Sequence, residues 1–235
     1  MQPQMTIIVT GAAGNLGAAV EVALASRGAR LVLVDRTQEG LTALAEKLPT
    51  GTDVLTLPGV DLSDPIAADH MVKSATARFG QVTGLVNTIG GFAMGSILTD
   101  ALKQFDLMMQ LNARIPLVTS AAILPVLQAA NYGRIVHIAA GPGLKAPAMM
   151  GAYAASKAAV MRLVESLAEE HAKDHITANC ILPGTIDTPQ NRAAMPDADT
   201  SSWVTPAAIA ELIAFLVSKE GGIVTGAAIP ASGPV

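Results

Sequence analysis

The chain has one cysteine and very few aromatic side chains, and both scarcities narrow what it can be. Cys180 has no partner for an internal disulfide, which excludes a small secreted domain held together by such bonds. A lone cysteine fits a reducing compartment, so we expect a cytoplasmic protein. Only 3% of the 235 residues are aromatic, which leaves few rings to stack on a planar substrate.

Charge is also scarce. Charged residues make up 14% of the chain, the net charge is −4, and no block of basic residues occurs, so nucleic acid is not an expected partner. The start Met1-Gln2-Pro3-Gln4 lacks the basic and apolar regions of a signal peptide. No apolar stretch approaches about 18 residues without a charged residue, glycine or proline, so we expect no membrane span.

What the chain does have is a regular alternation of short apolar runs and longer helical patterns. This alternation is typical of a parallel sheet covered by helices on both faces. No repeat or linker interrupts it, so we predict an α/β fold with a single doubly wound parallel sheet in one domain, residues 1–235. The predicted strands are Thr6–Thr10, Arg30–Asp35, Asp53–Pro58, Gly84–Ile89, Arg134–Ala139, Thr177–Leu182 and Ala227–Pro230. The predicted helices are Leu16–Arg27, Thr37–Lys47, Asp64–Phe79, Thr99–Ala129, Ala152–His171 and Pro206–Leu216.

Two regions depart from simple alternation. The predicted helix 99–129 contains Pro116 and Pro125, so we expect two helices or a kinked one. Residues 184–204 show no clear element after the sixth strand, and a loop of that length in a compact domain is usually functional. It follows the carboxyl end of a strand, where open α/β sheets bind ligands. We therefore predict a substrate loop over residues 184–204.

A glycine-rich turn follows the first strand and opens the first helix. Gly11, Gly14 and Gly17 permit a tight turn, close approach of the backbone to a pyrophosphate, and close helix–strand packing. The helix N-terminus offers free N–H groups and the positive end of its dipole to phosphate. This strand–turn–helix arrangement predicts a dinucleotide site.

Acidic residues follow the next two strands. Asp35 lies 18 positions after Gly17, where a carboxylate accepts hydrogen bonds from the adenosine ribose and repels a 2′-phosphate, so NAD(H) is favoured. Arg36 could bind a 2′-phosphate, which leaves NADP(H) possible. Asp61 is expected at the adenine edge or as a helix cap, although Asp64, before a proline, is the better cap.

Tyr153 and Lys157 lie four residues apart in a predicted helix, so their side chains share one face. An ammonium group beside a phenol lowers the pKa of the phenol from its usual value of about 10. Such a tyrosine can donate a proton to a carbonyl or imine that receives a hydride. The pair also occurs by chance in ordinary helices, so the rest of the chain decides its meaning.

The ordered set of motifs resembles the short-chain dehydrogenase/reductase family over essentially the whole chain. The motifs are the glycine turn, Asp35, Asp61, Asn87, Asn112, the Tyr153/Lys157 pair and Pro183-Gly184. The resemblance implies a Rossmann fold and an NAD(P)-dependent oxidoreductase with a small-molecule substrate.

The resemblance also implies roles for particular residues. Tyr153 would be the general acid/base, Lys157 would bind the nicotinamide ribose and lower the pKa of that tyrosine, and Asn112 would hold a relay water. It implies a homo-oligomer, a dimer or a homotetramer, formed through the helices near Asn112–Ala129 and Ala152–His171. The expected cofactor-binding residues are Gly11, Gly14, Asn15, Leu16, Gly17, Asp35, Arg36, Asp61, Leu62, Asn87, Gly90, Tyr153, Lys157, Pro183, Gly184, Thr185, Ile186 and Thr188.

The chain departs from the family pattern at three places, one of which is Asn87-Thr88-Ile89-Gly90-Gly91 where the family has Asn-Asn-Ala-Gly; Asn87 and Gly90 remain there. Asn15 stands where the commonest glycine pattern has its second glycine. Ala140 lies 13 residues before Tyr153, where the family carries a substrate-orienting serine. By analogy with removing one oxyanion donor, its absence would lower the rate for a carbonyl substrate by about 10²–10³. Nearby Ser96 and Ser156 are poor substitutes.

The missing serine leaves several functions open. Quinonoid dihydropteridine reductases also lack it, and their active-site segments resemble Gly90-Gly91-Phe92-Ala93 and the Met149–Tyr153 stretch, which favours a small carbonyl or activated imine substrate. A 3-oxoacyl-thioester reductase or another alcohol dehydrogenase is the alternative within the family. A nucleotide-binding protein with weak or no catalysis is the alternative of another class. Expected substrate contacts are Phe92, Met94, Ala140, Met149, Met195 and Trp203, and we expect no metal.

Overall fold

The computed structural model describes residues 4–99 and 101–233. Its centre is a seven-stranded, entirely parallel sheet with the strand order β3-β2-β1-β4-β5-β6-β7. The predicted doubly wound fold is confirmed, and each predicted strand is present with small shifts at its ends. The strands are β1 (Thr6–Thr10), β2 (Arg30–Asp35), β3 (Val54–Pro58), β4 (Gly84–Asn87), β5 (Gly133–Ile138), β6 (Ile176–Pro183) and β7 (Ala228–Ala231).

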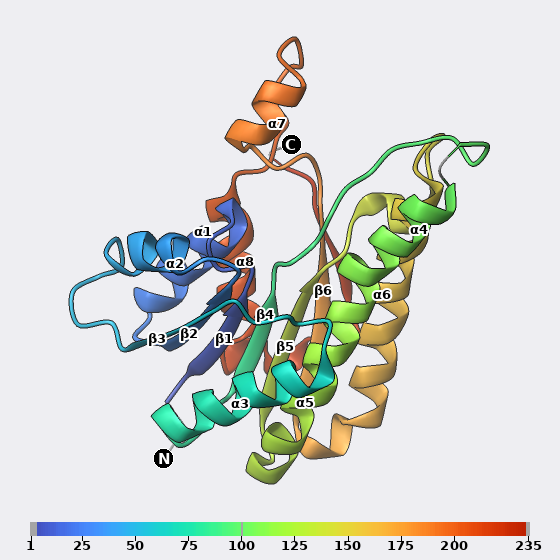
Figure 1. The fold of residues 1–235 in the computed structure, drawn as a ribbon. Helices are drawn as coiled ribbons and strands as arrows, with labels where there is room; N and C mark the ends of the chain where they lie inside the picture. The colour runs from blue at the N-terminus through green and yellow to red at the C-terminus, as the bar shows by residue number, and fades with distance from the viewer. Residues whose placement is uncertain (1–3, 100, 234–235) are drawn as a thin grey trace.

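Helices cover both faces of the sheet (Figure 1). One core cluster packs α1, α2 and α8 on one face, and the other packs α3, α5 and α6 on the opposite face. Strands buried on both faces need near-continuous apolar sequence, and the β1 residues Ile7, Ile8 and Val9 are indeed fully buried. The helices are α1 (Asn15–Ala25), α2 (Gln38–Ala45), α3 (Pro65–Phe79), α4 (Ala101–Met109), α5 (Ile115–Ala130), α6 (Gly151–Glu170), α7 (Pro189–Ala194) and α8 (Pro206–Leu216).

The predicted helix 99–129 is divided, but not at its prolines. A π-helical turn, Gln110–Arg114, joins α4 to α5 and places the buried Asn112 at the centre of the turn. Pro116 lies in the first turn of α5, where a missing N–H is tolerated, and Pro125 lies inside the helix. The expected start at Thr99 is wrong, because that residue lies in a bend before the helix and residue 100 lies outside the described residues.

The same run, residues 101–130, is 30 residues long and apolar enough by length and composition alone to cross a membrane. The run contains Lys103, Asp106, Arg114, Pro116 and Pro125, so it is not an unbroken apolar stretch, and a core helix passes the same test of length and composition. In the fold, Ile115, Ile123 and Leu127 pack into the core beneath the sheet, as in the central helix of an α/β domain.

The segment 184–204 is not the structureless loop that the sequence predicts, because it contains the short helix α7. Thr188 caps this helix, its hydroxyl oxygen accepting a hydrogen bond from the Asn191 N–H at 3.2 Å, and Pro189 follows at the first helical position. Figure 1 shows α7 standing away from the sheet, above α1, near the C-terminus.

Candidate active site and cofactor cleft

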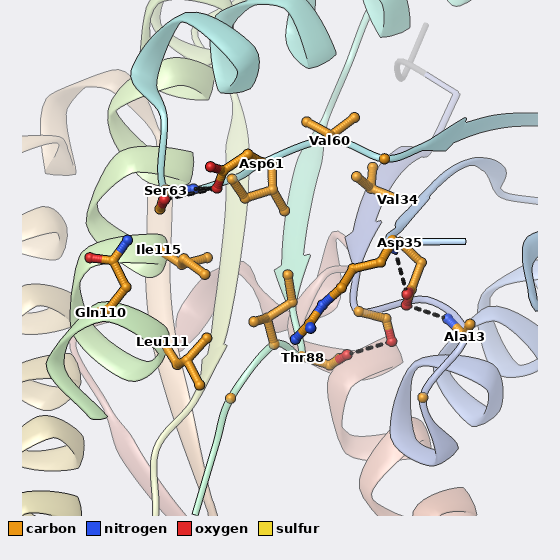
Figure 2. Close-up of a pocket in the computed structure, with 17 residues that line it drawn as sticks. Ala13, Val34, Asp35, Val60, Asp61, Ser63, Thr88, Gln110, Leu111 and Ile115 are labelled. Carbon is orange, nitrogen blue, oxygen red and sulfur yellow. Dashed lines mark hydrogen bonds between the residues drawn. The ribbon is translucent and has the colours of Figure 1, made fainter. Parts of the chain in front are cut away.

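A cleft of about 750 Å³ opens where the strand order reverses, between β1 and β4 (Figure 2). Crevices at this switch point, beyond the carboxyl ends of the strands, are where open α/β sheets bind ligands. Seven of the expected cofactor residues line it: Gly11, Gly14, Asp35, Arg36, Asp61, Leu62 and Gly90. The sequence reasoning missed ten further lining residues: Ala13, Val34, Gly59, Val60, Ser63, Thr88, Ile89, Gln110, Leu111 and Ile115.

The glycines of the turn let neighbouring atoms come closer to the backbone than a side chain would allow. Gly11 has a φ of +71°, and a Cβ there would lie 2.7 Å from the Thr88 hydroxyl oxygen. A Cβ on Gly17 would lie 2.3 Å from the Gly11 carbonyl oxygen, so this glycine is needed for packing. The N-cap residue Gly14 provides no side-chain acceptor, and the first turn of α1 has no acidic residue. The N–H groups at this helix end therefore suit a phosphate group.

Asp35 is held in place at the end of β2. One carboxylate oxygen accepts a hydrogen bond from the Ala13 N–H at 2.9 Å and the other from the Arg36 N–H at 2.6 Å (Figure 2). The carboxylate thus ties β2 to the glycine turn and stays at the cleft wall. Arg36 lines the same cleft, so a bound ligand would face a negative and a positive side chain there.

Asp61 lines the cleft and does not cap a helix. Its Oδ1 accepts hydrogen bonds from the hydroxyl and the N–H of Ser63, at 2.8 and 3.0 Å, and these bonds lower the pKa of the Asp61 carboxyl (Figure 2). The cap of α3 is Asp64, whose Oδ1 accepts from the Ile66 N–H at 3.0 Å, as the sequence predicts. Leu62 is nearly buried beside them.

The loop after β4 passes directly beside the candidate catalytic residues. Asn87 accepts hydrogen bonds from the Thr10 hydroxyl at 2.7 Å and the Ile89 N–H at 3.1 Å, while its buried Nδ2 has no partner in the described chain. A Cβ on Gly90 would lie 3.0 Å from Asn112 Oδ1 and 3.2 Å from Lys157 Nζ. A glycine at this position therefore lets the cleft wall run against the catalytic side chains.

The structure brings Tyr153 and Lys157 together on α6. Lys157 is almost fully buried, and its Nζ donates a hydrogen bond to the Ile138 carbonyl at 2.8 Å and lies 5.9 Å from the Tyr153 ring centroid. Burial lowers the pKa of Lys157 to about 8. The edge-on ring of Phe92 packs against Tyr153 with the centroids 5.0 Å apart.

The pKa of Tyr153 is shifted in the direction opposite to the expected one. Burial of the phenol raises its pKa, because desolvation disfavours the phenolate. The Lys157 ammonium is directed to the Ile138 carbonyl and does not outweigh this effect. In this structure the tyrosine is therefore a protonated acid at neutral pH.

Asn112 connects the loop after β4 to α6. Its Oδ1 accepts from the Gly91 N–H at 2.8 Å, and its Nδ2 donates to the Gly91 carbonyl and to Ser156 Oγ, each at 3.0 Å. Ser156 in turn donates to the Tyr153 carbonyl at 2.7 Å. Both polar atoms of the Asn112 side chain are thus engaged by protein groups. Its side chain links the loop after β4 to α6, and its expected role in holding a relay water stays a prediction.

Ala140 lies two residues beyond the end of β5 and is buried. Neither nearby serine replaces the missing hydroxyl, because Ser156 is bound to Asn112 and Ser96 accepts from the Leu98 N–H. His137 is fully buried, with its Nε2 2.9 Å from the Ser120 hydroxyl, and burial lowers its pKa to about 3. It is therefore a core histidine and does not take the place of the missing serine.

The expected substrate residues separate into two groups. Phe92, Met94, Met149 and Met195 are exposed at 60%, 51%, 50% and 39%. Met149 has a positive φ of 66°, and its carbonyl accepts from the Gly95 N–H at 2.8 Å, which joins the two loops beside Tyr153. Trp203 is only 8% exposed, so the expectation of an available indole ring is wrong.

The expected cofactor residues at the end of β6 lie outside the cleft lining. A Cβ on Gly184 would lie 2.9 Å from the Ser232 carbonyl oxygen, so Pro183-Gly184 runs against the C-terminal residues. Ile186 forms a bridge with Val204, which closes the base of the segment. The other expected residues outside the lining are Asn15 and Leu16 at the start of α1, Gly17 and Asn87 in the interior, Tyr153 and Lys157 on α6, and Thr185 and Thr188 beside α7.

Comparison with known proteins decides the family. A family model described as short chain dehydrogenase matches residues 5–199. The chain belongs to this family. Like other short chain dehydrogenases it is an oxidoreductase, and the family uses NAD(P).

Several short chain dehydrogenases resemble the chain along nearly its whole length. It is 30% identical to levodione reductase of Leifsonia aquatica, over 97% of this chain and 92% of that protein. It is 29% identical to 2-(S)-hydroxypropyl-CoM dehydrogenase 3 of Xanthobacter autotrophicus, over 97% and 94%. The crystal structure of levodione reductase matches with a TM-score of 0.90 and 27% identity, over 97% of this chain and 96% of that one. A short-chain dehydrogenase/reductase from Mycobacterium ulcerans, 24% identical with a TM-score of 0.90 over 98% and 90%, shares the fold.

Proposed function

We propose that this oxidoreductase reduces a small carbonyl or activated imine, or oxidises the corresponding alcohol or amine, with Tyr153 as general acid/base. The proposal is supported by Gly90, which lines the dinucleotide cleft and lies against the side chains of Asn112 and Lys157, while Tyr153 precedes Lys157 by one turn of α6. A nicotinamide bound there would supply or accept the hydride.

The chain itself supplies the proton. As a hydride reaches the substrate carbon, the Tyr153 hydroxyl gives its proton to the substrate oxygen or nitrogen and becomes a phenolate. Burial favours the neutral phenol before this transfer, and the ammonium of Lys157, 5.9 Å from the ring, favours the phenolate after it. In the reverse direction the same phenolate takes the proton from the alcohol.

The cleft favours NAD(H) over NADP(H). The Asp35 carboxylate is fixed by two backbone N–H groups at the end of β2, where it would bind the adenosine ribose and repel a 2′-phosphate. Arg36 is the opposing influence, because its guanidinium in the same cleft could bind that phosphate.

Ala140 favours an electron-poor substrate, such as a quinonoid dihydropterin-like imine. Such a substrate needs less polarisation than a ketone, and no hydroxyl stands at this position to polarise one. A 3-oxoacyl thioester or another ketone of the same family is the alternative, and a nucleotide-binding protein with little catalysis is the alternative of another class.

The substitution Ala140→Ser separates these functions. A wild-type protein that reduces a quinonoid dihydropterin or a ketone with NADH supports the enzyme proposal. An increase of about 10²–10³ in ketone reduction by the variant would match the return of one hydrogen-bond donor. A wild type inactive on both substrate types, with activity appearing only in the variant, would support the nucleotide-binding alternative.

We also propose that the protein is a homo-oligomer, a dimer or tetramer. Supporting this, a hollow of about 590 Å³ lies over α4, α5 and α6, lined by Met109, Ala113, Leu117 and Leu163 among others. Leu117 is 53% exposed there, and a second copy of the chain is the proposed partner for this face.

A further inference from the structure

One hydrogen bond joins the start of α1 to the helix α7, although the two are far apart in sequence. Asn15 Nδ2 donates to Gln190 Oε1 at 2.7 Å across a separation of 175 residues. Asn15 is the first residue of α1, directly after the glycine turn, and it stands where the family commonly has a glycine with no side chain to offer. The contact therefore depends on the residue that departs from the family pattern.

The helix α7 is otherwise stabilised from within its own segment. Thr188 caps it, Asn191 Nδ2 donates to the Ile186 carbonyl at 2.8 Å, and Arg192 forms a two-point ion pair with Asp187. Within the described chain, the Asn15 contact is the one hydrogen bond from residues 189–202 to anything outside 184–204. Within the described residues, one exposed amide pair is thus the hydrogen-bonded link between α7 and the body of the protein.

The position of the pair gives it a chemical role. The N-terminus of α1 is where the pyrophosphate of a dinucleotide is expected. In the described structure Gln190 Nε2 makes no hydrogen bond to protein, so it remains a neutral donor beside that helix end. Amide donors are suited to phosphate oxygens, and Asn15, the partner of Gln190, directly follows Gly14 of the glycine turn.

We propose that Gln190 is a cofactor-retaining residue, which joins Asn15 across the pyrophosphate of bound NAD(H) and slows its release. The proposal rests on the NAD(P) site described above. It makes α7 the part of the substrate segment that closes on the cofactor, and it gives a function to the asparagine in the glycine turn.

The test is the rate of NADH release, measured by stopped-flow fluorescence after displacement with excess NAD. Asn15→Ala and Gln190→Ala should each accelerate release about three- to tenfold, the effect of one neutral hydrogen bond. If the pair acts as one contact, the double variant should release NADH no faster than the faster single variant. Gln38→Ala removes an exposed glutamine that bonds only to Thr42 within α2, and it should leave the rate unchanged.

A charge change separates a phosphate contact from a simple link between the two side chains. Gln190→Glu keeps an acceptor for Asn15 but places a negative charge beside the pyrophosphate, so release should be at least as fast as in Gln190→Ala. Wild-type release rates in both Gln190 variants, or multiplicative effects in the double variant, would overturn the proposal while the cofactor site stands. A wild-type protein that binds neither NADH nor NADPH would overturn the cofactor site and this proposal together.

Discussion

Replacing Glu21 with glutamine should remove much of the sensitivity of this fold to alkaline pH. Glu21 lies in α1 and is fully buried, and neither of its carboxylate oxygens has a hydrogen-bond partner in the described structure. Burial, with a smaller contribution from Asp35, raises its pKa from 4.5 to about 9. The folded protein therefore holds the proton far more tightly than the unfolded chain does.

The sign and size of the effect follow from this difference. The stabilisation of the protonated folded state is complete below the unfolded pKa of 4.5 and is lost as pH rises towards about 9. Over that interval each pH unit lowers the free energy of unfolding by about 1.4 kcal/mol. Between about pH 5.5 and pH 8.5 the loss is on the order of 4 kcal/mol, whereas a glutamine is neutral throughout.

Urea unfolding of the wild type and of Glu21→Gln at about pH 5.5, 7 and 8.5 measures how the free energy of unfolding depends on pH. The stability of the variant relative to the wild type should rise by on the order of 4 kcal/mol across the series, because other titrating groups cancel in the difference. Glu39→Gln, at an exposed position of α2, is the matched control and should show no such rise. A difference between wild type and Glu21→Gln that stays constant with pH would refute the buried, protonated carboxyl.

Three further predictions concern the cofactor, the pH profile and the assembly. Asp35→Ala should narrow the preference for NADH over NADPH, and a variant that discriminates as strongly as the wild type would show that Asp35 is not the selector. The pKa of Lys157 is lowered to about 8, so its ammonium loses its proton as pH rises through that value and no longer stabilises the Tyr153 phenolate. The kcat/KM for NADH in the reductive direction should therefore fall, and a flat profile to about pH 9.5 would contradict this prediction. Leu117→Arg should shift the protein towards smaller species in analytical ultracentrifugation, since it adds a second arginine beside Arg114 in the hollow over α4, α5 and α6 and removes an exposed apolar side chain. An unchanged sedimentation coefficient would remove that face as the interface.

Much of the fold could be predicted because its signals are local. Strands buried on both faces must be short and almost wholly apolar, and each such run in the sequence became a strand. The glycine turn and the cap at Asp64 are likewise determined by residues adjacent in the sequence. The same kind of signal, Thr188 before Pro189, marks α7, and the sequence reasoning passed over it because that helix is short.

The parts of the site that could not be predicted depend on distant contacts. Asn112, at the centre of the π-helical turn, forms hydrogen bonds with Gly91 and Ser156, which belong to two other segments of the chain. The pKa of Tyr153 depends on how deeply α6 buries the phenol and on where Lys157 directs its ammonium, and spacing alone gives neither.

The most direct test of the central claim is single-turnover oxidation of NADH by the wild type and by Tyr153→Phe, with a reducible carbonyl or a quinonoid dihydropterin in excess. If Tyr153 donates the proton, the variant should lose about 10²–10⁴ in rate, the usual contribution of a general acid, and should bind NADH within a few-fold of the wild type. An undiminished rate in Tyr153→Phe would contradict the account.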